Sequence, residues 1–521
     1  MPDRGRNRAS LCVVATCLGL CGALITVGCG QTELDRARIS WTGAPAPMDK
    51  FITDYILGIN VEPDFRAQLF KPKYYSPPEP FYSFPNNEDA MTLALSARVG
   101  ESFPAEDVFY TDLYWFRSFE PEWLESCEEL TVPIDGQPRV LREIIPVDLA
   151  SACELSGELY AVPFSIRGNC LYYRKDLVAN PPKTWPELIA IARDVLHSGS
   201  PDVPNLGLSF HWKELHTDLY PVLWGYGGGI PTCLTPSGDL NTRLESDQNL
   251  AALAMFFDLM HGDDPAAQQR LCLPWDELTS RTAEDEKRLF EEFASGRTLF
   301  AIDWSNRASR IAEQLNQTQA RGFSAHNIGV APIPHGPDTS HSFAVVGSWG
   351  WALAANPRSP HSRDFIRQMA SPDTQLHFFI KHAEVPIYRQ SVLEQLAEWP
   401  ATRRRLTDFH VSLLDLLHGA GTRSGVVLRD RPRFKEVNRL IAEALQRALA
   451  PRADGNETPQ FDANRAREHL KLADERILAY LRRLHDLKID CSCDPRDPAS
   501  VPAPAVAPPA VTPADTAPRT E

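Results

Sequence analysis

Eight aromatic and polar residues fall at or near the ends of segments that the sequence predicts to be strands, and they have the clearest capacity for chemistry. Flat apolar rings beside a few hydrogen-bonding charges suit a sugar, which offers an apolar ring face and a rim of hydroxyls. Core packing is the alternative for any single tryptophan, so the inference rests on the group. The candidates are Asp112, Trp115, Phe164, Arg167, Trp224, Trp304, Trp349 and Arg389.

Familiar catalytic motifs are absent from the sequence. It contains no G-x-S-x-G nucleophile turn, no H-E-x-x-H zinc motif and no G-K-[ST] phosphate loop. The 14 histidines are scattered, and adjacent acids such as Glu128 and Glu129 are typical of solvated helix faces. We therefore expect no enzymatic activity, no metal and no cofactor. An exported carbohydrate-active enzyme with an unfamiliar site is the alternative.

The stretch from residue 160 to 188 is expected to organise the elements that position these side chains. Its first half is rich in β-branched and aromatic residues and reads as a buried strand. Thr184 is then expected to cap a helix that has Pro186 in its first turn and continues to His197. A second strand, 298–302, should deliver Trp304 at its exit.

Further strands and helices alternate along the chain, which favours an α/β fold with parallel sheets and helices on both faces. We expect strands near 39–41, 108–109, 207–209, 328–331 and 343–354, and helices near 48–57, 88–97, 219–225, 249–261, 362–371, 373–381, 432–449 and 463–487. Residues 71–86 combine prolines with aromatics and are expected to form an ordered loop.

The N-terminus has the pattern of an export signal. A basic segment, 4–8, precedes an apolar run at 11–27, and the small residue Gly28 stands before Cys29. This ending resembles a bacterial lipobox, which implies cleavage after residues 1–28, lipidation of Cys29 and a tether at 29–38. An ordinary signal peptide or an uncleaved anchor is the alternative. Each of these places the body of the protein outside the cytoplasm.

Cysteine usage leaves the pairing open. The seven that follow Cys29 are Cys127, Cys153, Cys170, Cys233, Cys272, Cys491 and Cys493. In an oxidising compartment some of them can pair. We expect a disulfide between Cys233 and Cys272, which stand in loop-like contexts, with isolated buried thiols as the alternative.

Length and composition bound the architecture. A chain of 521 residues exceeds the size at which a single core keeps growing, so two lobes are expected. Hydrophobic and charged fractions of 43% and 23% are those of a soluble globular protein. A net charge of −15 without a basic stripe argues against nucleic-acid binding. The Pro- and Ala-rich tail, 489–521, lacks the apolar content to pack and is expected to be disordered.

Several segments in series resemble the family 1 extracellular solute-binding proteins, the maltose- and trehalose-type receptors of ABC importers. The segment that carries most of the likeness is GELYAVPFSIRGNCLYYRKDL with NPPKTWPEL, and the others are DVFYTDLYW, FASGRTLFAIDW, IGVAPIPHGP, GSWGWALAANPRSP and SPDTQLHFFIKHAEVPIYRQSV. Together they span about residues 39–485. Their order and spacing make the match specific.

The resemblance implies a two-lobed, type II periplasmic-binding-protein-like fold whose hinge the chain crosses three times. The N-terminal lobe would comprise 39–165 with 343–387, and the C-terminal lobe 166–342 with 388–488. A ligand would bind between the lobes, and closure would follow by hinge bending.

Site residues follow from the resemblance by position. Asp112 matches an acid that bonds sugar hydroxyls, and Trp304 matches a stacking aromatic of the second lobe. Trp349 matches the tryptophan of a Gly-rich turn that faces the ligand, and Arg389 matches a basic residue of the same site. The loop after Trp224 matches a region that often lines the binding cleft.

Arg167 departs from the family pattern, because sugar-binding relatives commonly carry Asp or Glu there. Arginine can only donate hydrogen bonds and prefers carboxylate or phosphate partners. Two hypotheses follow. The ligand carries a negative charge, as in a uronic acid or a phosphorylated sugar, or Arg167 pairs with Asp112 in a site for a neutral sugar.

The predicted function is that of an exported, lipid-anchored and monomeric receptor that captures a carbohydrate and delivers it to the membrane permease subunits of an ABC importer. Two alternatives use the same fold. The chain could serve a membrane sensor kinase, or it could be a surface lipoprotein without a ligand.

Overall fold

A computed structural model describes most of the body of the chain. The described residues are 38–41, 68–69, 108–113, 116, 121–134, 136–198, 204, 206–210, 219–262, 271–272, 291–318, 323–355, 362–388, 408–418, 425–427, 434–451 and 459–486. The predicted export signal, most of the tether and the C-terminal tail lie outside them. So do the helices expected at 48–57 and 88–97, and the loop at 71–86.

The first sheet has the strand order β2-β1-β3-β15-β4, and β9 pairs with a further part of β15. β1, β2 and β3 are parallel to one another, whereas β15 runs antiparallel to each of its neighbours. The strands are β1 (Arg38–Trp41), β2 (Gln68–Leu69), β3 (Val108–Asp112), β4 (Leu124–Glu125), β9 (Ala161–Pro163) and β15 (Trp349–Ala354).

The second sheet has the order β11-β12-β10-β14-β16, and β13 also pairs with β10. β10 runs antiparallel to β12, β13 and β14, whereas β11–β12 and β14–β16 are parallel pairs. The strands are β10 (Arg167–Arg174), β11 (Leu206–Phe210), β12 (Thr298–Trp304), β13 (Ile328–Ala331), β14 (Ala344–Gly347) and β16 (Gly425–Val427).

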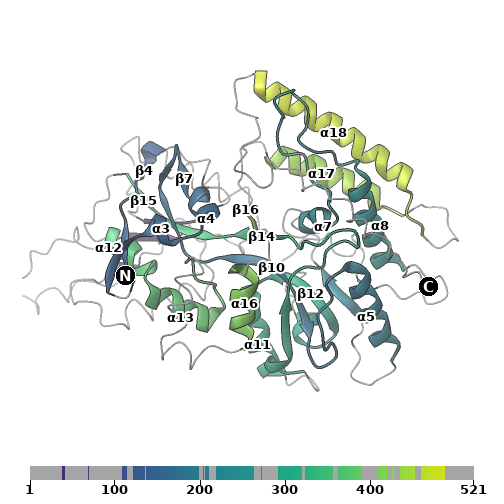
Figure 1. Ribbon diagram of the computed structural model, residues 1–521, viewed down its shortest axis with the longest axis horizontal. Helices are drawn as coiled ribbons and strands as arrows, with labels where there is room; N and C mark the ends of the chain where they lie inside the picture. Colours follow the sequence, from purple (N-terminus) through teal and green to yellow (C-terminus); the bar gives the residue numbers. More distant parts are fainter. Residues whose placement is uncertain are drawn as a thin grey trace, which may run out of the picture.

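Helices surround the two sheets, which lie side by side in Figure 1. On the left of the view, near the first sheet, are α3 (Leu141–Ile144), α4 (Val147–Ala152), α12 (Ser362–Met369) and α13 (Pro372–His382). With the second sheet are α5 (Trp185–His197), α7 (Tyr220–Gly225), α8 (Asp247–His261), α11 (Arg307–Thr318), α16 (Asp408–His418), α17 (Phe434–Leu449) and α18 (Ala463–Asp486). Short 3-10 turns occur at η4 (Pro121–Trp123) and η5 (Ala325–Asn327).

The chain passes from one sheet to the other in short segments. It leaves the first sheet after Pro163 and enters the second at Arg167, and it returns between Gly347 and Trp349. The strand at 344–347 is hydrogen-bonded to β10 and β16, so the return lies at Ser348 rather than at the predicted residue 343. After α13 the chain runs back toward the second sheet, where α16 packs against β13.

The sheets are mixed, and the expectation of parallel sheets is wrong for β10 and β15. Both strands follow directly after a passage between the lobes. A strand that starts at the hinge runs away from it, whereas β3 and β12 run toward the hinge and end there. β10 and β15 are therefore antiparallel to their neighbours because each begins at a passage between the lobes. The alternation of helices and strands in the sequence does not reveal where these passages lie.

The two faces of β10 belong to two different cores. Cys170 and Tyr172 pack in the cluster that includes the first sheet with α11 and α16, whereas Leu171 and Tyr173 pack in the cluster of α5, α7, α8, α17 and α18. Side chains alternate between the faces of a strand, so one fully buried strand can serve both clusters. β10 is therefore the central structural element of the molecule.

Helix α5 shows how local sequence fixes an element at its predicted place. The Thr184 hydroxyl accepts a hydrogen bond from the Glu187 amide, and the Glu187 carboxylate accepts one from the Thr184 amide, 3.3 Å in each case. This capping box, with proline in the first turn, confirms the predicted start, and the helix ends at His197 as expected.

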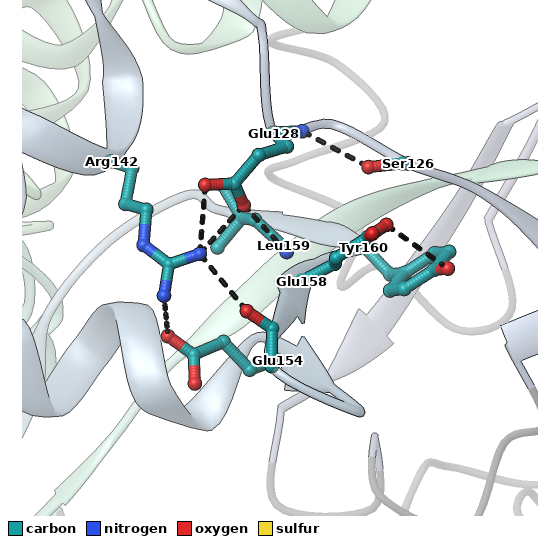
Figure 2. A network of polar contacts seen from close by, with 8 residues as sticks. Ser126, Glu128, Arg142, Glu154, Glu158, Leu159 and Tyr160 are labelled. Atoms are coloured by element: carbon teal, nitrogen blue, oxygen red, sulfur yellow. Dashed lines mark hydrogen bonds and ion pairs between the residues drawn. The ribbon is translucent and has the colours of Figure 1, made fainter.

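A polar network fixes the hairpin that precedes the first passage (Figure 2). The Arg142 guanidinium donates to Glu128 at 2.6 and 2.8 Å and to Glu154 at 2.6 Å, and Glu128 also accepts from the Leu159 amide at 3.0 Å. The hairpin joins β7 (Glu154–Leu155) and β8 (Glu158–Leu159). It leads directly into β9, so the network anchors the chain just before it crosses. Another two-stranded ribbon joins β5 (Thr131–Ile134) and β6 (Gln137–Val140).

The disulfide predicted between Cys233 and Cys272 is wrong. Cys233 is disulfide-bonded, but Cys272 carries a thiol, as do Cys127, Cys153 and Cys170. All four thiols are buried, and burial raises the pKa of Cys127 to about 12. The alternative prediction, a buried thiol at each of the two positions, therefore holds for Cys272 and not for Cys233, whose disulfide partner is not among the described cysteines.

Neither a membrane-spanning helix nor a group of three or more metal-ligating side chains occurs in the described part of the chain.

Alkylation of the purified chain tests the cysteine assignment. When the chain is unfolded in guanidinium without reductant and treated with iodoacetamide, we expect mass spectrometry to find the label on Cys127, Cys153, Cys170 and Cys272. Cys233 should take the label only after reduction. A sample with Cys272 protected and Cys233 labelled would contradict the assignment.

A buried carboxylate connects α18 to the segment that leads into α8. Asp474 is fully buried and accepts hydrogen bonds from the amides of Leu244 and Glu245, at 3.0 and 3.3 Å. Burial raises its pKa to about 6, against the opposing effects of these amides and of Arg243. The native state therefore binds this proton more tightly than the unfolded chain does.

Replacing Asp474 should change the pH dependence of stability. Its proton stabilises the native state fully below about pH 4, and this contribution is lost as the pH rises through about 6. Asp474→Asn should therefore gain stability relative to the parent between pH 4 and 7, on the order of 2 kcal/mol. Urea unfolding at several pH values measures this. Asp486→Asn, at the exposed end of α18, is the control, and parallel pH profiles for parent and Asp474→Asn would contradict the prediction.

Candidate ligand-binding site

The ends of β3 and β12 and the starts of β15 and β10 lie at the edges of the two sheets that face the hinge. In the first sheet, Asp112 ends β3 and stands opposite Trp349, the first residue of β15. In the second, Trp304 ends β12 and stands opposite Asn169 near the start of β10. Strand direction alone thus brings an acid and two tryptophans to the same region of the molecule.

The passage at 347–349 links the two tryptophans. A Cβ atom placed on Gly347 would lie 3.2 Å from the Trp304 ring, which is tighter than ordinary contact. Glycine therefore lets the Trp304 indole lie against this backbone. Trp349 follows two residues later in the other sheet, and both indoles are partly exposed.

Hydrogen bonds fix the three passages against one another. The Phe164 amide donates to the Trp349 carbonyl at 2.7 Å, and the Ser348 hydroxyl donates to the Ser165 carbonyl. The Ile166 amide donates to the Val385 carbonyl at 2.8 Å. The first passage therefore lies between the other two and is bonded to both.

Arg167 pairs with an acid that the sequence reasoning missed. Its Nε and Nη2 donate to the two carboxylate oxygens of Glu384, each at 2.7 Å, and Asn306 Nδ2 donates to the same carboxylate at 3.0 Å. The side chains of Arg167 and Glu384 are 15% and 9% exposed. This is the bidentate geometry that arginine favours with carboxylates. The sequence-based hypothesis named only Asp112 as a partner, whereas the structure pairs Arg167 with Glu384.

Two of the predicted aromatic residues belong to the cores instead. Phe164 is 1% exposed and packs edge-on against Phe378, with ring centres 4.4 Å apart. Trp224 on α7 is 6% exposed and packs against Tyr220 and Phe343. Neither ring offers a free face to a ligand, which corrects the expectation for both residues. Such burial depends on long-range neighbours that the sequence does not reveal.

For Asp112 the structure describes the backbone alone. Trp115, Arg389 and Cys29 lie outside the described residues. Of the eight candidates, Arg167, Trp304, Trp349 and the backbone of Asp112 lie at strand ends that face the hinge.

Two buried polar atoms, one on the first passage and one near the start of β10, are also missing from the sequence prediction. Ser165 Oγ and Asn169 Oδ1 have no hydrogen-bond partner among the described residues, and their side chains are 0% and 1% exposed. Buried polar groups are costly when unpaired, so each is a place where a water molecule or a hydroxyl could add a bond. Asn169 is noteworthy because it stands beside Trp304. The sequence feature that could have pointed to Asn169 is a polar side chain within a segment of β-branched and aromatic residues.

Comparisons with a protein-family model, with curated proteins and with solved structures all match this chain to solute-binding proteins. The family model described as bacterial extracellular solute-binding protein matches residues 104–403. A probable ABC transporter-binding protein of Deinococcus radiodurans is 23% identical over 301 residues, which cover 56% of this chain and 64% of that relative. A maltodextrin-binding protein of Bacillus subtilis, MdxE, is 24% identical over 237 residues, 44% of this chain and 51% of the relative. The chain thus matches less than two thirds of the length of either relative.

Among solved structures, the maltose-bound MalE3 of T. maritima superimposes with a TM-score of 0.59 at 20% identity, covering 85% of this chain and 98% of that one. This likeness shows the two-lobed type II binding-protein fold. Because the family model covers more than half of the sequence, the chain belongs to the bacterial extracellular solute-binding protein family.

Proposed function

We propose that the chain is a receptor that captures a neutral carbohydrate between its two lobes and delivers it to the permease of an ABC importer. The observation that carries the proposal is the pair Trp304 and Trp349, which come from different sheets and are both partly exposed on either side of the passage at Ser348. A sugar that contacts both rings binds both lobes at once. Binding of this kind stabilises the closed arrangement over the open one.

The balance of charge supports a neutral ligand. Arg167 is compensated by Glu384, and Arg307 Nε lies 3.7 Å from the Asp303 carboxylate. An anionic sugar would have to compete with these carboxylates for the arginines. The hypothesis of an acidic ligand rested on Arg167 alone, so we propose a sugar without a charged group.

The names of the relatives also support a carbohydrate. One curated relative is a maltodextrin-binding protein, and the MalE3 structure contains maltose. Linear glucosides present several pyranose rings with apolar faces, which suit two indoles. We therefore place a short neutral oligosaccharide first among the ligands to test.

The lobes, the anchor and the mode of action complete the proposal. We divide the chain into a lobe of residues 39–165 with 348–387 and a lobe of residues 166–347 with 388–488. The lipobox-like sequence before Cys29 supports a lipid anchor that holds the monomer at the outer face of the cell membrane. The receptor binds its ligand without chemical change and has no catalytic role.

A panel of saccharides tests the ligand class. Maltose, maltotriose and trehalose represent neutral sugars, and glucuronic acid and glucose 6-phosphate represent acidic ones. A ligand at 100 times its Kd stabilises the native state by about 2.7 kcal/mol, which raises the Tm by several degrees. We expect a rise with at least one neutral oligosaccharide and none with the acidic sugars. A rise with the acidic sugars alone would refute neutrality, and no rise with any sugar would refute the carbohydrate proposal.

Alanine substitutions separate ligand contact from core packing. Trp304→Ala and Trp349→Ala should each weaken binding of the sugar that passes the panel by about tenfold or more. Trp224→Ala, at a core position, should lower the free energy of unfolding by about 3–5 kcal/mol. Isothermal titration and urea unfolding measure the two effects. Unchanged affinity in both Trp304→Ala and Trp349→Ala would contradict the proposed site.

A further inference from the structure

We propose that Glu384 is a positioning residue of the hinge, which fixes the angle between the lobes by holding the third passage onto the first. The proposal rests on the proposed function in one respect, that the lobes close around a ligand. Glu384 acts through Arg167 and Asn306 and has no contact with the ligand in this assignment.

The Glu384 carboxylate joins three parts of the chain that are far apart in sequence. It stands just after α13, while Arg167 starts β10 and Asn306 directly precedes α11. Its two oxygens accept three hydrogen bonds, two of them from the guanidinium. Bonds between charged groups in a partly buried site are stronger than neutral ones and fix direction as well as distance.

The backbone on both sides of Glu384 is held as well. The His382 carbonyl accepts a hydrogen bond from the Ser309 hydroxyl at 3.1 Å, and the Val385 carbonyl accepts one from the Ile166 amide at 2.8 Å. The segment is therefore bonded to α11 before Glu384 and to the first passage after it. The carboxylate lies at the centre of this set of contacts.

Ala383 supplies an independent sign that this segment is constrained. It adopts φ +56°, a left-handed conformation that alanine rarely takes, at the end of α13. Residues persist in such conformations when surrounding contacts hold them, and they cluster at switch regions and ligand clamps. The left-handed residue ends α13, and Glu384, the next residue in the chain, forms the ion pair with Arg167.

A more exposed arginine–glutamate ion pair, which lies within one lobe, provides the control. Arg363 on α12 donates to Glu125 at the end of β4, and both residues lie with the first sheet. Loss of this pair also removes an arginine–carboxylate bond, but it leaves the passages between the lobes unchanged. Glu125→Gln should therefore leave the hinge unaffected.

Amide hydrogen exchange is the first test. In Glu384→Gln the Ile166 amide should exchange roughly tenfold faster, the factor expected for the loss of a charged hydrogen bond. The Phe164 amide, which donates to Trp349 on the other passage, serves as the internal reference and should change little. Equal protection of Ile166 in Glu384→Gln and in the parent would overturn the proposal.

The distance between the lobes is the second test, because it would not change if Glu384 stabilised only its immediate surroundings. Spin labels at Glu143→Cys on α3 and Ala190→Cys on α5, both exposed positions, report the separation of the lobes. We expect Glu384→Gln to broaden the distance distribution and Glu125→Gln to leave it as in the parent. Arg167→Gln should match Glu384→Gln, and the double variant should be no broader than either single one, because the same interaction is removed.

A second variant and a check of folding complete the test of Glu384. If Glu384→Gln does not fold, Asn306→Ala removes only one of the three bonds and should give a smaller broadening of the same kind. The measurement needs no ligand, so a chain that binds no saccharide would refute the proposed function without affecting this test. An unchanged distribution in folded Glu384→Gln, judged by near-UV circular dichroism, would refute the role of Glu384.

Discussion

The hydrogen bonding of the first passage between the lobes is the constraint on which the rest of the structure depends. Residues 164–166 are bonded through Phe164 to the second passage and through Ile166 to the third. Without these bonds the three passages would be independent linkers, and the relative placement of the sheets would be set by chain length alone. With them, the three passages form a ribbon of hydrogen-bonded segments at the hinge.

The position of this ribbon also determines where the residues of the candidate ligand-binding site lie. Strands that approach it end there, and strands that leave it begin there, so the polar and aromatic residues at those ends converge from both sheets. The same edge holds the Arg167–Glu384 ion pair and two buried polar atoms that have no hydrogen-bond partner within the described part of the chain. Such an edge favours a ligand that presents hydroxyls and apolar faces over one that presents a strong charge.

Much of the fold could be predicted because its signals are local. The start of α5 was visible from Thr184, Pro186 and Glu187, and the exit of β12 at Trp304 was visible from a short apolar run after Gly296. Helices α8, α17 and α18 also lie near their expected positions. Caps, turns and periodic burial depend on neighbours within a few residues, which a sequence displays directly.

The candidate site was predicted less well, because its features depend on distant partners. Arg167 stands out in the sequence, but its partner Glu384 lies more than 200 positions later, in a segment matched only for its family likeness. Phe164 resembles a site residue by position, and only the packing of Phe378 and Trp351 shows that it is buried. Strand direction in β10 and β15 was missed for the same reason, since it follows from how the passages are connected.

The central place of β15 in the first sheet has a consequence for how the protein can be divided. β15 is the partner of β3, β4 and β9, yet it follows β10 to β14 in the sequence, and the second sheet in turn receives β16 only at 425–427. No continuous stretch of the chain contains one sheet without strands of the other. Neither lobe can be expressed as a simple fragment, and the ribosome must release residue 427 before both sheets can be completed.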